Sequence, residues 1–306
     1  MEAQLTDEEL AWVAALRRAV QAEAADVVAY AASLSLFEMA QYAIVSKGDV
    51  EKGCSRLRTM SSIHRELKLD EVDGAEALAY MLEKWPSMFL VAAVDATGMP
   101  IWGMRYRDFA PKDVKSWPLW KMYMKTQLAF LDSMMCDLRA VRLGLEIVCD
   151  MAGMGWSNFD REVEERGTSV FQDGYPMKIH GFVLSDSPWW INALLAIARL
   201  FVKKKLMEKI TMVKSADGAI APRLPAGATP RSMGGGDAAP TDEESIAASV
   251  RWMEARLARR AACIAAVEAQ GAGVGAGGSC VAPGEAPAGA PGAAAAADAG
   301  NSGGSI

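Results

Sequence analysis

The sequence predicts an α/β fold, in which an all-helical N-terminal section precedes a parallel or mixed β-sheet with crossover helices. Up to about residue 84, apolar residues recur every three to four positions, which is the spacing of amphipathic helices. Beyond that point, short apolar runs alternate with helical stretches of roughly 12 or more residues, long enough to connect parallel strands. We therefore expect helices packed beside and over a sheet.

The N-terminal section is expected to begin with a helix near residue 7. Thr6 and Glu9 have the spacing of a capping box, in which two side chains satisfy backbone N–H groups at the start of a helix. Polar breaks at residues 46–49 and 70–74 divide the helical pattern that follows.

Strands are expected after residue 85. Two short apolar runs, residues 88–94 and 100–106, flank the turn-forming sequence at 95–98 and predict a β-hairpin. The remaining elements expected along the chain are a helix at 115–143, a strand at 144–150, a helix at 157–172, a strand at 177–184, a helical segment at 188–206, a strand at 209–213 and a helix at 241–269.

The segment PWWINALLAIARLFVKKKL, residues 188–206, is apolar on nearly every face and ends in three lysines. Its apolar run, Trp189 to Val202, has 14 residues and is interrupted by Asn192 and Arg199, whereas a bilayer-spanning helix needs about 20. It is therefore not a transmembrane helix. A buried core helix, a helix on a membrane surface and a movable wall over an apolar cavity remain as alternatives.

The composition excludes some classes of function. With 51% hydrophobic residues, the 306-residue chain can bury a sizeable core. Its formal net charge of −6 argues against nucleic acid as a partner, because phosphate binding depends on clustered positive charge. The N-terminus is acidic where a signal peptide is basic, and the five irregularly spaced cysteines form no disulfide framework, so we expect a cytoplasmic protein.

The sequence contains no recognisable catalytic or metal-binding pattern. The two histidines, His64 and His180, lie in different sections without the spacing of zinc ligands. Neither a GxSxG elbow nor a GxxxxGK[ST] phosphate loop occurs, and the glycine-rich run at 271–278 follows no strand. We therefore expect no enzyme activity, no metal and no cofactor.

Several motifs together resemble the CRAL-TRIO lipid-binding family, also described as phosphatidylinositol-transfer-protein-like. The most specific block is QDGYPMKIHGFVLSDSPWWINALLAIARLFVKKKLMEKITMV at 172–213: a Tyr-Pro, a strand, an apolar helix and a lysine-rich end. Shorter matches are GDVEKGCSRLRTMSSIHREL (48–67), VDATGMPIW (94–102), GLEIVCDMAGM (144–154) and LPAGATPRSMGGG (224–236). The resemblance covers about residues 35–255.

This resemblance implies four parts. They are a helical N-terminal section at 1–85, a CRAL-TRIO domain at 86–240, a C-terminal helix at 241–270 and a Gly/Ala/Pro-rich tail at 271–306. The tail has small residues but almost nothing to bury, so disorder is expected there.

In such a fold the sheet floors an apolar cavity, and residues 188–206 form its gate. One face of the gate would meet cargo when closed, and another would meet lipid when open. Trp190, Leu194, Ile197 and Phe201 form one stripe of a helix, for which ordinary core packing is the alternative explanation. The residues expected to line the cavity or gate are Ile147, Tyr175, Met177, Phe182, Trp190, Leu194, Ile197 and Phe201.

Basic residues gather beside the expected gate. Lys178, Lys205 and Lys209 match positions that contact phosphoinositide headgroups in the tocopherol-transfer and retinaldehyde-binding branch of the family. With Lys203 and Lys204 they are expected to meet an anionic membrane surface, where each basic residue contributes about 1 kcal/mol. A solvated charge run without a partner is the alternative.

Departures from the family pattern bear on the cargo. Met177 replaces the glutamate of members that hold phosphatidylinositol, and Leu145 and Ile147 replace hydroxyl residues of the yeast-type phosphatidylcholine binder. Gln41, Ile44 and Ser46 stand where relatives carry arginines. We therefore expect a neutral hydrophobic cargo, such as a sterol, tocopherol, carotenoid or retinoid-like molecule. The leading hypothesis is lipid transfer with peripheral membrane docking, and the alternative is a lipid-sensing interaction module. Oligomeric state is not predicted.

Overall fold

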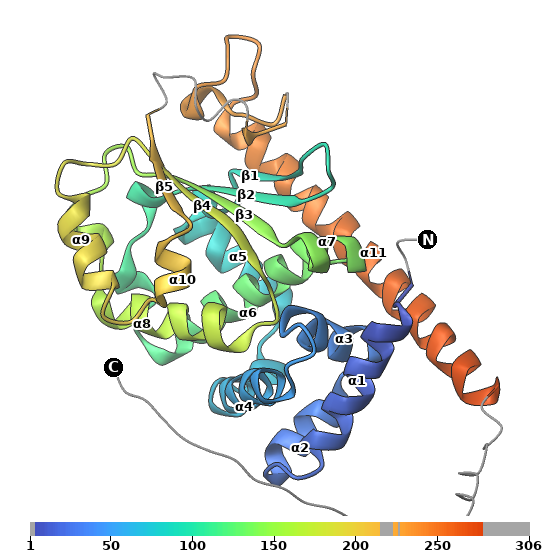
Figure 1. The fold of residues 1–306 in the computed structure, drawn as a ribbon. Helices are drawn as coiled ribbons and strands as arrows, with labels where there is room; N and C mark the ends of the chain where they lie inside the picture. The colour runs from blue at the N-terminus through green and yellow to red at the C-terminus, as the bar shows by residue number, and fades with distance from the viewer. Residues whose placement is uncertain (1–3, 215–222, 226, 278–306) are drawn as a thin grey trace, which may run out of the picture.

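A mixed five-stranded sheet forms the centre of the fold. The computed structural model describes residues 4–214, 223–225 and 227–277. Within them the strand order is β1-β2-β3-β4-β5, and Figure 1 shows helices on both sides of the sheet with a further group of helices beside it. β1 pairs antiparallel with β2, and all later pairs are parallel. The predicted α/β fold with a mixed sheet is confirmed.

The N-terminal section is helical, as predicted. Thr6 and Ser35 each cap a helix through a capping box. Gly48, at a φ of +73°, lies in the break between two helices, where a Cβ atom would collide with the Trp12 ring. Its elements are α1 (Asp7–Val20), α2 (Ala25–Ser33), α3 (Leu36–Val45), α4 (Val50–Leu67), η1 (Leu69–Glu71) and α5 (Gly74–Lys84).

The sheet and its connections follow. The hairpin and the three later strands are found where the sequence predicts them, with ends shifted by at most three residues. The elements are η2 (Pro86–Phe89), β1 (Val91–Val94), β2 (Pro100–Arg105), η3 (Tyr106–Asp108), η4 (Pro111–Asp113), α6 (Trp117–Met134), α7 (Leu138–Leu143), β3 (Leu145–Asp150), η5 (Trp156–Asn158), α8 (Arg161–Ser169), the π-helical turn η6 (Val170–Gly174), β4 (Ile179–Ser185), α9 (Ile191–Ala198), α10 (Lys204–Met207), β5 (Ile210–Val213), η9 (Arg231–Met233) and α11 (Asp242–Gly277).

Strand register divides the sheet into two apolar faces. Ile147 pairs with Trp102 on β2 and with Phe182 on β4, so these side chains form a row on one face. Val148 and Val183, one position further along, belong to a separate core cluster on the other face. Both faces are therefore buried, as expected for largely parallel sheets.

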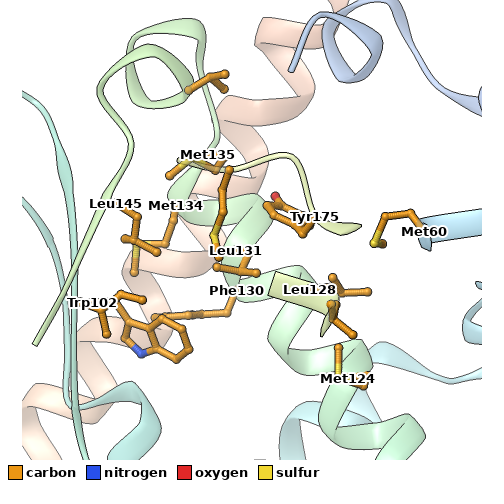
Figure 2. Packing of buried hydrophobic residues seen from close by; sticks show 14 of the residues in the cluster. Met60, Trp102, Met124, Leu128, Phe130, Leu131, Met134, Met135, Leu145 and Tyr175 are labelled. Atoms are coloured by element: carbon orange, nitrogen blue, oxygen red, sulfur yellow. The ribbon is translucent and has the colours of Figure 1, made fainter. Parts of the chain in front are cut away.

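The first face packs against α6. Trp102 and Phe130 lie with ring centroids 5.2 Å apart, and Figure 2 shows them near Leu145 and Met134. All four side chains are buried. This packing fixes α6 across one end of the sheet and leaves the rest of the face to the cavity described below.

Two predicted single helices are divided in the structure. The one predicted at 115–143 is α6 and α7, because Asp137 begins a new helix by accepting a hydrogen bond from the Ala140 N–H. The one predicted at 188–206 is α9 and α10, separated by residues 199–203. The helix predicted at 157–172 begins later, at Arg161, where Asp160 caps it.

The C-terminal helix α11 is longer than predicted. It continues to Gly277, seven residues beyond the predicted boundary at 270, and the predicted disordered tail from residue 278 lies outside the described residues. Figure 1 shows α11 running from the β1 edge of the sheet to the N-terminal helices. The Ser249 hydroxyl accepts from the Ala92 N–H at 3.0 Å, and the Gln270 amide bonds both backbone groups of Leu5. The helix thereby links the sheet to the N-terminal section.

A buried arginine on α11 holds three parts of the chain together. Arg260, 7% exposed, donates to the Met135 carbonyl at 3.1 Å and to Gln41 Oε1 at 3.0 Å. It also pairs with Asp132 at 3.1 Å, and Asp132 accepts from the Tyr175 hydroxyl at 2.8 Å. Burial raises the pKa of the Asp132 carboxyl, and the Arg260 charge opposes that shift.

Replacing Arg260 with methionine is expected to reduce the free energy of unfolding by about 3 kcal/mol, because Asp132 would lose its charge partner. The matched control is Arg259→Met, since Arg259 is 63% exposed and pairs with Asp137, so its loss should cost about 1 kcal/mol or less. Chemical denaturation of both variants measures the difference. Equal losses would contradict a structural role for the buried pair.

Candidate functional site

An apolar cavity of about 250 Å³ lies over the face of the sheet that carries Ile147. Trp102 on β2 and Phe182 on β4 form its floor with Ile147. A register shift beside Leu145 lets Ile179, three residues before Phe182, line the same cavity. The walls come from α6, α8, η6 and the gate segment, by which we mean residues 188–206.

The gate segment forms one wall, through α9, α10 and the chain between them. Gln172 spans the break between its helices: its amide donates to the Phe201 carbonyl at 2.9 Å and accepts from the Lys203 N–H at 3.0 Å. One side chain from η6 therefore satisfies backbone groups that a continuous helix would pair internally. The gate residues lining the cavity are Ile191, Leu194, Leu195, Ala198, Phe201, Val202, Leu206 and Met207.

Five of the eight residues predicted to line the cavity do so in the structure: Ile147, Met177, Phe182, Leu194 and Phe201. Tyr175 lines a different cavity, because its hydroxyl bonds Asp132. Trp190 and Ile197 are outside the cavity lining, since the face of α9 turned inward is that of Ile191, Leu194 and Leu195. Contact with a ligand stays a prediction for all eight.

The outer side of the gate exposes large apolar side chains. Trp190 stacks on Trp156 of η5 with ring centroids 4.6 Å apart, and Trp156 itself is 52% exposed. Trp189 is 92% exposed and Leu200 is 70% exposed. Large apolar side chains are usually buried, so a group of them exposed on one surface is unusual.

Two polar side chains line this otherwise apolar cavity, which the sequence did not reveal. The Glu164 carboxylate of α8 accepts a hydrogen bond from the Tyr106 hydroxyl, and Gln127 of α6 lines the same cavity. Burial raises the pKa of Glu164 to about 7. Glu164 lies in the charge-rich stretch REVEERGTS, where no pattern distinguishes the one inward carboxylate from its solvated neighbours.

The three lysines matched to headgroup-contacting positions come together. Lys178 precedes β4, Lys205 lies on α10 and Lys209 precedes β5. Partial burial lowers the pKa of Lys209, and the charges of Lys205 and Lys178 lower it further, so the three side chains are close. No salt bridge joins any of them to a carboxylate within the described ranges. Lys203, by contrast, pairs with Asp173, and Lys204 lies 3.9 Å from Glu208.

A second cavity, of about 460 Å³, lies between the N-terminal helices and α6. Its lining includes His64, Lys125, Asp132 and Tyr175, so it is polar. Burial lowers the pKa of His64, which keeps its imidazole neutral near pH 7. In the described part of the chain, no group of three or more His, Cys, Asp or Glu side chains is arranged to hold a metal ion.

No single helix in the ranges that the structure describes has both the length and the apolar character to cross a membrane. The pair α2 and α3 passes this criterion together, by length and composition only, with a bend of 114° between them.

Comparison with known proteins identifies the family. Residues 85–235 match the model of the CRAL/TRIO domain, so this part of the chain belongs to the CRAL-TRIO family. Proteins of this family bind lipids and are generally not enzymes. The crystal structure of Sfh5 is similar in fold, with a TM-score of 0.52 and 14% identity, over 78% of this chain and 91% of that one.

Curated relatives include the tyrosine-protein phosphatase non-receptor type 9 of Mus musculus and of Homo sapiens. Each is 24% identical over 105 residues, which are 34% of this chain. The match spans 17% of the length of either phosphatase, so the similarity concerns a small part of each phosphatase.

The raised pKa of Glu164 predicts a dependence of stability on pH. The native state retains this proton up to about pH 7, whereas the unfolded carboxyl, with an ordinary pKa of 4.5, has already lost it. The stabilisation is therefore complete below pH 4.5 and is lost as pH rises through 7, by up to about 3 kcal/mol. Denaturation curves of wild type and Glu164→Gln from pH 4 to 9 isolate this contribution, and parallel curves would contradict it.

Proposed function

We propose that this protein carries a neutral hydrophobic lipid in the apolar cavity, exchanging it when the gate segment opens at an anionic membrane. The observation that carries the proposal is an apolar cavity walled by a helix that is interrupted and held by a side chain from another segment. Gln172 closes the break between α9 and α10 with two hydrogen bonds. Breaking those bonds would free the gate without disrupting the sheet.

The charges and exposed side chains around the gate support docking at a membrane. Lys178, Lys205 and Lys209 form a cluster with no salt-bridge partner among the described residues, and each basic residue near an anionic surface contributes about 1 kcal/mol. Trp189 and Leu200, at opposite ends of α9, are exposed and could enter the interface between water and lipid. We infer that the protein is cytoplasmic and peripheral on membranes.

A lipid-sensing interaction module is the second candidate function. It is favoured by the similarity to a stretch of a tyrosine-protein phosphatase, in which the matched segment is a small part of a larger protein. In that role the same cavity would report lipid occupancy to a partner, and transfer between membranes would be incidental.

Carriage is tested by mass spectrometry of organic extracts from protein purified out of its own cells. Wild type should yield a stoichiometric neutral lipid. Leu194→Asp should lose it, because Leu194 is 7% exposed against the cavity and a buried carboxylate is costly there. Asn192→Asp is the matched control, since Asn192 is exposed on the same helix and should retain the lipid. Lipid-free wild type that also takes up none from vesicles would favour the interaction module.

Docking is tested with Lys178→Glu combined with Lys205→Glu. Binding to vesicles containing phosphatidylserine should weaken at least tenfold in a sedimentation assay, because two attractive charges become repulsive. Lys52→Glu with Lys112→Glu makes the same change in net charge at exposed lysines outside the cluster and should alter binding less than threefold. Equal effects of the two pairs would show that general charge, rather than this cluster, governs binding.

A further inference from the structure

Glu164 supplies the one carboxyl group among the described residues that line the apolar cavity, and no lysine, arginine or histidine is among them. One carboxyl oxygen of Glu164 accepts a hydrogen bond from the Tyr106 hydroxyl. The other oxygen has no hydrogen-bond or salt-bridge partner in the described part of the chain. Because an ionised carboxylate can accept several hydrogen bonds, Glu164 retains the capacity to bind a donor that enters the cavity.

The accessible part of Glu164 faces the cavity. The residue is partly accessible, in contrast to the fully buried side chains of the core. Burial nevertheless raises the pKa of its carboxyl to about 7, and the charge of Asp160 at the start of α8 adds to the increase. Asp160 is itself paired with exposed Lys115. A group that is removed from bulk water yet still accessible, and that lines a cavity, can be reached by what the cavity holds.

The ionisable groups beside Glu164 in the cavity carry no positive charge. They are Tyr106 of η3, Tyr123 of α6 and Cys149 of β3. Burial raises the pKa values of all three, and the nearby charge of Glu164 raises them further, so they remain neutral near pH 7. When Glu164 ionises, its charge therefore has no countercharge in the lining. An unpaired charge in an apolar cavity is costly, and a cation on a ligand would remove that cost.

Aromatic rings add a second attraction for a cation. Trp85, Tyr106, Phe109 and Tyr123 line the cavity and pack together, with ring centroids 4.4 to 6.5 Å apart. The faces of such rings attract ammonium groups. A phosphate or carboxylate would instead meet Glu164 without a countercharge. The lining thus selects positive over negative groups on a ligand.

We propose that the apolar cavity also binds hydrophobic amines, whose ammonium group donates a hydrogen bond to the unpartnered carboxylate oxygen of Glu164. The apolar remainder of the amine lies over the sheet, where Ile147 and Phe182 form the floor. A protonated Glu164 leaves the lining uncharged, so the same cavity still accepts neutral cargo. The inference rests on the proposed function, because it takes this cavity as the binding site, and it adds a second chemical class of ligand.

The test uses two probes that share one ring system, 2-(aminomethyl)naphthalene and 2-(hydroxymethyl)naphthalene. Their dissociation constants from the protein are measured by equilibrium dialysis at about pH 7.5. The preference for the amine over the alcohol should fall at least tenfold in Glu164→Gln, because the amide carries no charge. Glu165→Gln is the matched control, since Glu165 lies outside the cavity lining and pairs with Arg161, and its preference should change less than threefold.

The pH dependence of binding gives a second measurement on the wild-type protein. Below pH 7 the Glu164 carboxyl is protonated and cannot pair with an ammonium group. From pH 5.5 to 7.5 it ionises while the amine of the probe stays protonated, so amine binding should tighten at least tenfold. The alcohol should not tighten over this range. This comparison remains informative if Glu164→Gln does not fold.

The outcomes separate the amine site from the proposed function. A preference that is unchanged in folded Glu164→Gln, or amine binding to wild type that is independent of pH, would overturn the amine site. Binding of the alcohol alone would do the same and leave carriage of neutral cargo standing. Failure of both probes to bind would overturn carriage in this cavity and the amine site with it.

Discussion

The fold depends on the ion pair between half-buried Asp132 of α6 and buried Arg260 of α11. Arg260 also bonds Gln41 of α3, and Asp132 bonds Tyr175 just before β4. Four segments far apart in the sequence therefore converge on this pair, in which the Arg260 charge is almost entirely removed from water. Because a lone charge in that position is costly, α6 cannot move away from α11 without breaking the pair. The cavity is formed against an α6 that is anchored at this point.

The two cavities differ because they lie against opposite faces of α6. On one side of α6, Trp102 and Phe130 pack in the apolar core that leads toward the sheet. On the other side, Asp132 and Tyr175 face the N-terminal helices in a polar cavity. Opposite faces of α6 therefore border the polar and the apolar cavity. Tyr175 lines the polar cavity, although Met177, two residues later, lines the apolar one.

Local patterns predicted much of the fold, and long-range contacts decided the rest. The capping box at Thr6 and the hairpin around residues 95–98 depend on neighbours within a few positions, and both are found. The break at 199–203 depends on Gln172, about thirty residues earlier, and no local signal announces it. The sequence also did not predict which face of α9 points inward, because a segment that is apolar on every face does not indicate which side is buried.

The candidate site shows the same division. Ile147 and Phe182 were expected at the cavity from the family resemblance, and they share one face of the sheet because they are paired in register across β3 and β4. Four of the five lysines lie within residues 203–209, and Lys178 lies earlier in the chain. Only their surroundings separate Lys178, Lys205 and Lys209 from Lys203 and Lys204, which face Asp173 and Glu208. Glu164 could not be singled out, because its inward orientation results from tertiary packing around α8.

The stacked indoles of Trp156 and Trp190 give the proposed gate an optical signature. Their centroids lie 4.6 Å apart with the ring planes inclined by 22°, close enough for the excited states of the two rings to couple. Trp190 moves with α9, whereas Trp156 belongs to η5, outside the gate segment. Near-ultraviolet circular dichroism of the unlabelled protein therefore carries a contribution from the closed arrangement, and the position of α9 becomes visible in solution without an attached dye.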